Sequence, residues 1–214
     1  VSSQETNFLP IEFSNRTAYA KCWHQTFQES FMCGIAGVMY RGSENFGTGE
    51  ALIRMLDGCQ HRGPDSTGFA LYSPEASGQL KLRFFIDPVV TVDVDGAIDS
   101  IRARLLDLGA TIEEEAKAGD NYRVMIRYTG DVQKLSYEME HAAKVISIGT
   151  SLEIVKDVGT AHDVDDRYQV NQFSGTHGLG HVRLATESDV KPEASHPFWA
   201  TGFADVAIVH NGQI

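Results

Sequence analysis

The chain has 214 residues, which is enough for one large domain or for one domain with a small insertion. Its hydrophobic content of 42% and charged content of 22% are ordinary for a globular protein, and its formal net charge of −11 argues against nucleic acid as a partner. No apolar run approaches the roughly 18 residues that cross a membrane, and an odd number of cysteines without metal-ligand spacing favours a reducing, cytoplasmic location over a disulfide framework.

Residues 1–32 form a segment that the sequence patterns do not assign to the fold. Residues 1–31 show neither the helical nor the strand period, and the chain begins with Val rather than Met. Charged residues interrupt the segment throughout, so it lacks the apolar core of a signal peptide. We interpret residues 1–32 as a leader, a propeptide or a misassigned start, followed by the main domain at 33–214.

The next elements alternate between strand and helix. The apolar run from Gly34 to Tyr40, rich in Gly and Ala, predicts a buried strand. Thr48 is a candidate N-cap for a helix that reaches about Cys59, whose side chain continues the apolar face and is expected in the core. The stretch "HRGPDSTG" (61–68) is a loop by composition, and "FALY" returns to strand.

The middle of the chain predicts an inserted unit at about 80–172. The alternation of "LKLRFFI" is followed by a helix that Gly109 stops, and a second helix has Asp131 as its candidate cap. Over residues 88–156 we predict the order strand–helix–strand–strand–helix–strand, which is that of a ferredoxin-like α+β unit. The chain then returns to strands at "LGHVRLA" and "VAIVHNG".

Cys33 directly follows Met32, and two interpretations of this pair differ in chemistry. If Met32 is internal, Cys33 is a small core thiol, because free cysteine is among the most buried residue types. If Met32 is removed, Cys33 becomes N-terminal, and an α-amino group that titrates near neutral pH can act as general base toward the thiol. In the chain as written, the nitrogen of Cys33 is an amide and cannot be that base.

The stretch "GHVRLATES" (180–188) carries a candidate anion-binding group. A strand here places His181 and Arg183 on one face, where Arg183 can bind a carboxylate through two hydrogen bonds or form a surface salt bridge. His177 and His181 have the spacing of a helical zinc pair, but Gly178 and Gly180 disfavour a helix. We therefore predict no metal site.

Two loops are predicted from their composition, and the first has both a structural and a functional interpretation. Asn211-Gly212, after an apolar strand, is a strong signal for a type I′ hairpin turn. The Asn211 amide and the Gly212 N–H could equally donate to an oxyanion at a strand end. In "HRGPDS", Pro64 and Asp65 suit a capped turn in which Asp65 binds nearby N–H groups.

The stretches "MCGIAGV", "HRGPDSTG", "GHVRLATES" and "VHNG" occur in this order and together resemble the class II glutamine amidotransferases. The resemblance covers about residues 34–75 and 176–214. The longer stretch "GHVRLATESDVKPEASHPF" is most similar to the stand-alone glutaminase subunits related to glutamate synthase, including that of N-methylglutamate synthase. The resemblance implies an N-terminal-nucleophile hydrolase fold, a four-layer αββα sandwich of α+β class.

The family resemblance also implies a mechanism and its residues. Cys33, with a free amine, would attack the side-chain amide of L-glutamine, and Asn211 and Gly212 would hold the oxyanion. Arg183 would bind the substrate α-carboxylate, with Thr186 in the same pocket. Ammonia would pass to a synthase subunit, which would carry any flavin or iron–sulfur cluster, since this chain shows no cofactor motif.

Two departures and two alternatives accompany this resemblance. The acidic residue that the family uses for the substrate ammonium would follow Ile214, so we expect the chain to be a C-terminally incomplete fragment. The residues before Met32 would block the mechanism if they were retained. The alternatives are an amidotransferase domain that serves another acceptor, as in asparagine synthetase or amidophosphoribosyltransferase, and a non-catalytic regulatory subunit that retains the fold.

Overall fold

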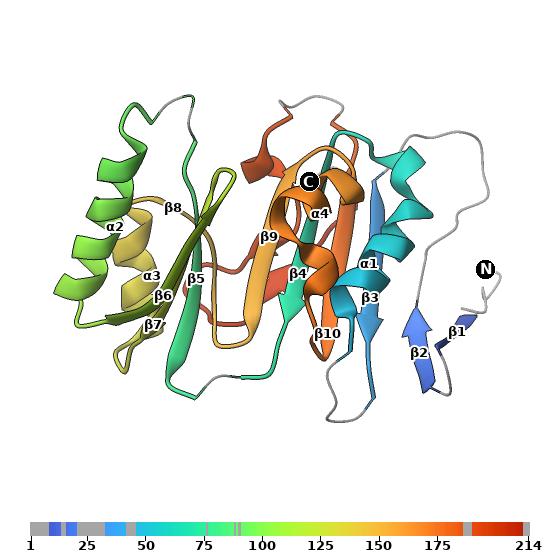
Figure 1. Ribbon diagram of the computed structural model, residues 1–214, viewed down its shortest axis with the longest axis horizontal. Coiled ribbons are helices and arrows are strands. Elements are labelled where there is room, and N and C mark those ends of the chain that lie inside the picture. The colour runs from blue at the N-terminus through green and yellow to red at the C-terminus, as the bar shows by residue number, and fades with distance from the viewer. Residues whose placement is uncertain are drawn as a thin grey trace, which may run out of the picture.

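The computed structural model describes residues 33–41, 46–75, 77–87, 89, 91–185 and 190–211, together with the backbone of two strands at 9–13 and 16–20. These residues form a structure of the predicted α+β class, with four α-helices and antiparallel sheets (Figure 1). Within the described ranges, no helix has both the length and the apolar character needed to cross a membrane.

The elements follow one another in mixed order along the chain. The strands are β1 (Leu9–Phe13), β2 (Arg16–Ala20), β3 (Gly34–Met39), β4 (Ser66–Tyr72), β5 (Gln79–Phe85), β6 (Thr111–Ala118), β7 (Asn121–Arg127), β8 (Lys144–Gly149), β9 (Leu152–Val158), β10 (His177–Arg183), β11 (Phe198–Trp199) and β12 (Ala207–Ile208). The helices are α1 (Thr48–Asp57), α2 (Val94–Asp107), α3 (Val132–Glu140) and α4 (Ala161–Tyr168), with short 3₁₀ turns η1 (Gln60–Arg62), η2 (Val170–Gln172) and η3 (Pro192–Ala194).

The larger sheet has six antiparallel strands in the order β1-β2-β3-β10-β4-β9, and α1 and α4 cover one of its faces (Figure 1). Leu52 and Leu56 of α1 are fully buried against β10. A Cβ atom on Gly178 or Gly180 of β10 would lie 2.8 Å from one of these two leucine side chains. Glycine at these positions therefore allows the helix to lie directly on the strand.

The smaller sheet has four antiparallel strands in the order β6-β7-β5-β8, with α2 and α3 packed against it (Figure 1). Alternate residues of β5 face the two helices, and their side chains form a core with buried positions of α2 and α3: Leu80, Leu82, Phe84, Ile101, Leu105, Leu135 and Met139. This strand order, with the element order from β5 to β8, matches the predicted ferredoxin-like arrangement.

The position of this unit along the chain differs from the prediction. Its strand–helix–strand–strand–helix–strand order runs from Gln79 to Gly149 rather than over 88–156. The reason is that β9, the last strand of the predicted range, pairs with β4 in the larger sheet. The wider bounds of the insertion, about 80–172, stay a prediction.

The local helix signals gave mixed results. Asp131 caps α3 as predicted, because its carboxylate accepts hydrogen bonds from the backbone N–H groups of Gln133 and Lys134. Gly109 follows the end of α2 with a φ of 83°, which is the left-handed conformation typical of a helix stop. The predicted N-cap Thr48 is wrong, since Gly47 holds that position and the Thr48 hydroxyl instead donates to the carbonyl of Gly175, 2.9 Å away.

Three further expectations can be compared with the structure. The helix reaches only to Asp57, but Cys59 is buried as expected, with 3% of its surface exposed. Residues 1–31 were expected outside the fold, yet β1 and β2 form a hairpin that pairs with β3. In "VAIVHNG" the predicted strand shortens to Ala207–Ile208.

Candidate functional site

Three of the quoted sequence stretches meet at one end of the larger sheet. β10 lies between β3 and β4 and is antiparallel to both, with Val182 opposite Gly34 and Arg183 opposite Ser66. The residue before β3, the residue before β4 and the end of β10 therefore lie side by side. This geometry brings Cys33, Asp65 and Arg183 to the same end of these three neighbouring strands, whose arrangement is seen in Figure 1.

Cys33 lies partly exposed beside the backbone that follows β10. Its Sγ atom is 3.4 Å from the backbone nitrogen of Leu184, which donates to it, and 3.9 Å from the carbonyl oxygen of the same residue. Cys33 is therefore neither a fully buried core thiol nor distant from Arg183. The partial exposure of Cys33 does not fit the interpretation as a small core thiol, and Met32 itself lies outside the described residues.

Asn211 reaches the same place from the other end of the sequence. Its side-chain nitrogen Nδ2 donates a hydrogen bond of 2.6 Å to the carbonyl oxygen of Cys33. An amide donor thus lies beside the cysteine backbone, 178 residues away along the chain. Gly212, the second predicted oxyanion donor, lies outside the described residues, and so does Thr186 of the predicted substrate pocket.

Asp65 fixes the backbone that follows Arg183. The Asp65 backbone nitrogen donates to the carbonyl of Arg183 at 3.1 Å, and its carboxylate accepts from the backbone nitrogen of Ala185 at 2.7 Å. Asp65 therefore binds the residue before and the residue after Leu184, the residue whose backbone N–H donates to Cys33. The expectation of a locally capped turn is therefore wrong, because the partner of the Asp65 carboxylate lies 120 residues further along the chain.

Two glycines allow these segments to come so close. A Cβ atom on Gly63 would lie 2.5 Å from the carbonyl carbon and oxygen of Val182, and one on Gly34 would lie 2.7 Å from Sγ of Cys59. Backbone atoms cannot move aside as a flexible side chain can, so Gly63 is required for the loop to touch β10. This gives a physical reason for the glycine in "HRG".

Arg183 and His181 point to the face of β10 opposite α1, while Val182 packs into the core on the helical side. Both are buried, with 8% and 1% of their surfaces exposed. His177 and His181 lie in a strand, as the glycines predict, and their rings contact different partners, Tyr72 and His196.

A cluster of three histidines, His181, His196 and His210, links β10 to the segment that contains Asn211. His181 is 3.1 Å from the carbonyl oxygen of His210 through Nε2, and its ring centre lies 4.7 Å from that of His196. Burial, with the nearby charge of His196, lowers the pKa of His181 to about 3. Burial and the charge of Lys156 lower the pKa of His196 to about 4. Both rings are therefore neutral at pH 7, and the Nε2–H of His181 can donate to the carbonyl that precedes Asn211.

Sequence reasoning missed this cluster and the role of Asp65. The signals were present, since His181, His196 and His210 all lie within the quoted stretches. Only contacts between segments that are distant along the chain show that the three come together.

The arrangement combines a nucleophile, an amide donor and a buried cation. A partly exposed thiol accepts from the backbone N–H of Leu184, an asparagine amide binds the carbonyl of the same cysteine, and a buried arginine ends the neighbouring strand. Such a set can attack a carbonyl carbon, hold the resulting oxyanion and bind a carboxylate of the same ligand. Its use as a nucleophile requires a base, which the neutral amine of a chain beginning at Cys33 would supply.

The two known proteins that match most of this chain are both named as glutamine amidotransferases or as similar to them. No protein-family model matches the chain. A protein of Methanothermobacter thermautotrophicus whose name places it among the glutamine amidotransferases is 33% identical over 192 residues, which is 86% of this chain and 62% of that protein. The glutamine amidotransferase-like protein GlxB of Rhizobium meliloti is 32% identical over 195 residues, 86% of this chain and 59% of that protein.

The chain is similar to glutamine amidotransferases. A shorter similarity, 31% over 83 residues, extends to a glutamine–fructose-6-phosphate aminotransferase of M. thermautotrophicus and covers 39% of this chain and 14% of that protein. The chain spans 62% and 59% of the length of the two relatives that match most of it. Their similarity therefore supports a glutamine amidotransferase-like function. The activity of the whole protein is proposed in the next section.

Proposed function

We propose that this chain is the glutamine-hydrolysing part of a class II amidotransferase with Cys33 as its N-terminal nucleophile. The observation that carries the proposal is the convergence at Cys33. Leu184 N–H contacts its sulfur, Asn211 contacts its carbonyl, and Arg183 ends the neighbouring strand. The similarity to glutamine amidotransferases over 86% of the chain supports the substrate, L-glutamine.

The reaction has two halves. The neutral α-amine of Cys33 accepts the thiol proton, and the sulfur attacks the side-chain amide carbon of glutamine. The tetrahedral oxyanion is held by Asn211 and Gly212; the C–N bond then breaks, and ammonia leaves with the proton from the amine. Water attacks the γ-glutamyl thioester, which releases glutamate and restores the thiol. Arg183 binds the substrate α-carboxylate, with Thr186 lining the same pocket.

This mechanism sets one condition on the chain. The nitrogen of Cys33 must be freed from its peptide bond to Met32, as removal of residues 1–32, or a start at Met32 followed by loss of that methionine, would achieve. Until then the amide nitrogen cannot accept a proton, and the protein would be an inactive precursor. We further propose that the complete protein folds as a four-layer αββα sandwich and delivers ammonia to a glutamate synthase-like partner that carries the flavin or iron–sulfur cofactor.

The experiment is glutamine hydrolysis by the full-length protein whose N-terminus has been determined by mass spectrometry. We expect glutamate and ammonia in equal amounts from protein beginning at Cys33, and a loss of at least about 10³-fold in the Cys33→Ala variant, as for other removed nucleophiles. The Cys59→Ala variant is the matched control, since Cys59 is a buried core thiol, and it should keep its activity.

Two outcomes would contradict the proposal. Hydrolysis by Cys33→Ala at the wild-type rate would remove the nucleophile from the mechanism. Folded protein that begins at Cys33 and does not hydrolyse glutamine, alone or with its partner, would favour the non-catalytic alternative.

A further inference from the structure

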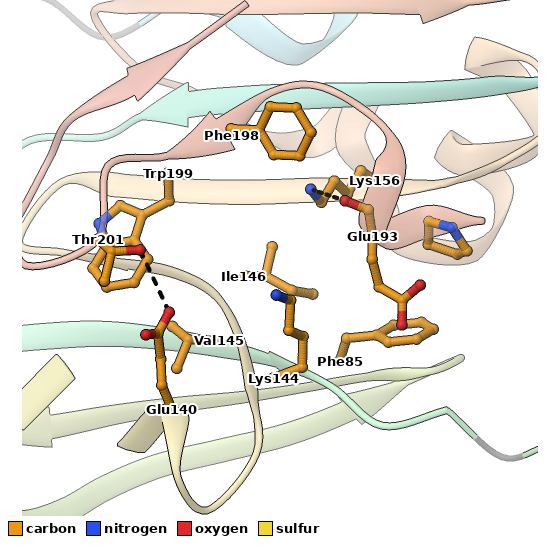
Figure 2. A pocket seen from close by; sticks show the side chains of 11 residues that line it. Phe85, Glu140, Lys144, Val145, Ile146, Lys156, Glu193, Phe198, Trp199 and Thr201 are labelled. Carbon is orange, nitrogen blue, oxygen red and sulfur yellow. Dashed lines mark hydrogen bonds between the residues drawn. The ribbon is translucent and has the colours of Figure 1, made fainter. Parts of the chain in front are cut away.

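A second concave site lies where the smaller sheet meets the segment that follows β10. It is a pocket of about 150 Å³ between β8, the end of β5, β9, η3 and β11 (Figure 2). A space of that volume can hold a group about the size of a benzene ring. None of the residues that line it belongs to the catalytic set proposed above.

The floor and the rim of the pocket differ in chemistry. Val145, Ile146, Phe85 and Trp199 are largely buried and form an apolar, partly aromatic floor. Trp199 keeps its indole N–H away from the pocket, because Nε1 donates to the carbonyl of Phe203 at 2.7 Å. The floor therefore suits an apolar group and offers little to a polar one.

Lys156 places a positive charge inside one wall. Its ammonium donates to the carbonyls of Ser195, Pro197 and Glu193 at 2.8, 3.3 and 3.4 Å, and it lies 4.7 Å from the ring centre of Phe198. Burial, with the charge of Lys144, lowers its pKa to about 8, so it is mostly charged at pH 7. No carboxylate among the described residues forms an ion pair with it, so the charge remains available to attract an anion.

The rim carries two charged groups that form no ion pair or side-chain hydrogen bond among the described residues, the Lys144 ammonium and the Glu193 carboxylate, although Glu193 attracts the Lys156 ammonium from a longer distance. In the view of Figure 2, the Lys144 side chain extends between the carboxylates of Glu140 and Glu193, and the Glu193 carboxylate points away from Lys156. Glu140 already accepts from the Thr201 hydroxyl at 3.4 Å. The rim thus offers a cation and a carboxylate at the mouth of an apolar floor.

The pocket is held in shape by contacts that do not depend on a ligand. Lys156 fixes the backbone from Glu193 to Pro197. Asp205, in the segment between β11 and β12, ties the chain that follows Trp199 to the connection between β8 and β9, because its carboxylate accepts from the backbone N–H groups of Thr150, Ser151 and Leu152 at 3.0, 2.8 and 2.8 Å. A ligand would therefore lose little free energy to ordering the site.

We propose that this pocket binds a free α-amino acid with an apolar side chain. The side chain would lie on the floor between Phe85, Ile146 and Trp199. The carboxylate would bind Lys144 within the positive field of Lys156, and the α-ammonium would bind Glu193. An uncharged or singly charged ligand satisfies only part of this arrangement, and glutamine itself, with a polar side chain, suits the floor poorly.

The test compares three probes of the same shape with the full-length protein. L-phenylalanine carries both charges, hydrocinnamate lacks the ammonium, and phenethylamine lacks the carboxylate. Trp199 reports binding by fluorescence once every other tryptophan, including Trp23, is replaced by Phe. We expect L-phenylalanine to bind with a dissociation constant at or below about 1 mM, and each of the other probes to bind at least about tenfold more weakly, because one charge-assisted contact is lost.

The rim residues Lys144, which is exposed, and Glu193, which is partly exposed, allow variants that should fold normally. Lys144→Met should weaken phenylalanine binding about tenfold and leave phenethylamine unchanged. Glu193→Gln should weaken phenylalanine binding and leave hydrocinnamate unchanged. Lys134→Met is the matched control, since Lys134 is an exposed lysine on α3 that does not line the pocket, and its affinity should equal that of the wild type.

Clear outcomes would overturn this proposal. The first is the absence of phenylalanine binding up to about 10 mM, about ten times the expected dissociation constant. The second is equal affinity for all three probes. The third is an equal loss of phenylalanine affinity in Lys144→Met and Lys134→Met. The proposal is independent of glutamine hydrolysis, because the titrations are run in the Cys33→Ala background, where a failure of the proposed catalysis leaves pocket binding intact.

Discussion

The two sheets of this molecule are held in place by different kinds of contact. In the larger sheet, glycines such as Gly34, Gly63 and Gly180 allow backbone segments and α1 to approach closely, and the candidate site forms where they meet. The smaller sheet meets the larger one through apolar contacts, which place Ala70 and Ile154 in the same buried cluster as Leu82. It also meets it through charge, because Lys81 and Arg83 of β5 and Arg123 of β7 surround Glu153 of β9. The comparison indicates that close steric fit sets the geometry of the candidate site, whereas buried ion pairs contribute to the attachment of the second unit.

The largest effect is expected from breaking the charge cluster. Glu153 accepts from Arg123 at 2.7 Å and from Arg83 at 3.1 Å. Burial raises the pKa of Glu153, but these arginines and Lys81 outweigh it and hold the pKa at about 2. Glu153→Gln would leave Lys81 and Arg83 without a carboxylate and Arg123 with only Glu114, so we expect a loss of about 4 kcal/mol in the free energy of unfolding by urea.

The matched control is Glu50→Gln on α1, one of the helices that cover the larger sheet. Glu50 pairs with Arg54 one turn away, and more than half of each side chain is exposed. Such surface pairs contribute at most about 0.5 kcal/mol. If both variants lost the same stability, the cluster at Glu153 would not be what attaches the smaller unit.

The second prediction concerns the steric fit at the candidate site. Gly63→Ala would place a Cβ atom 2.5 Å from the backbone of Val182, so the loop or β10 must shift. We expect a cost of about 3 kcal/mol in unfolding free energy. We also expect a fall of at least about tenfold in glutamine hydrolysis, since small displacements of reacting groups are costly.

Gly58→Ala is the control for this substitution. Gly58 follows α1 with helical angles, φ −62° and ψ −21°, and its Cβ would lie 3.4 Å from the nearest atom outside its immediate neighbours. Alanine fits such a position and should change stability by less than about 1 kcal/mol. Unchanged hydrolysis in Gly63→Ala would show that the contact between the "HRG" loop and β10 does not shape the site.

The same comparison explains which features could be predicted from the sequence. The helices of the smaller unit carry local signals, such as the Asp131 cap and the Gly109 stop, and both were predictable. The Asp65–Ala185 contact and the histidine cluster join residues that are distant along the chain, and no local pattern encodes such pairings. β6 carries no strand signal of its own, because its exposed, glutamate-rich sequence lacks the alternation of a half-buried strand. The convergence of Cys33, Arg183 and Asn211 was expected only from the family resemblance.

The smallest effect concerns pH and compares a histidine in each unit. His181 is buried in the larger sheet, and its pKa is lowered to about 3 by burial and by the nearby His196. An unfolded histidine has a pKa near 6.5, so below pH 6.5 the unfolded state binds a proton that the folded state does not. This term therefore stabilises the fold fully above pH 6.5 and is lost progressively as the pH falls toward 3. Between pH 7 and pH 5 it amounts to about 2 kcal/mol.

Urea unfolding at pH 7 and pH 5 measures this term when wild type and His181→Gln are compared. The wild type should lose about 2 kcal/mol more than the variant over this interval, because the variant has no proton to take up at position 181. His141→Gln is the control, since His141 lies exposed at the end of α3 in the smaller unit, and its pH dependence should equal that of the wild type. An identical pH dependence in all three proteins would mean that His181 is not held neutral in the fold. In that case its Nε2–H would no longer be the group that fixes the His210 carbonyl and, through it, the approach of Asn211 to Cys33.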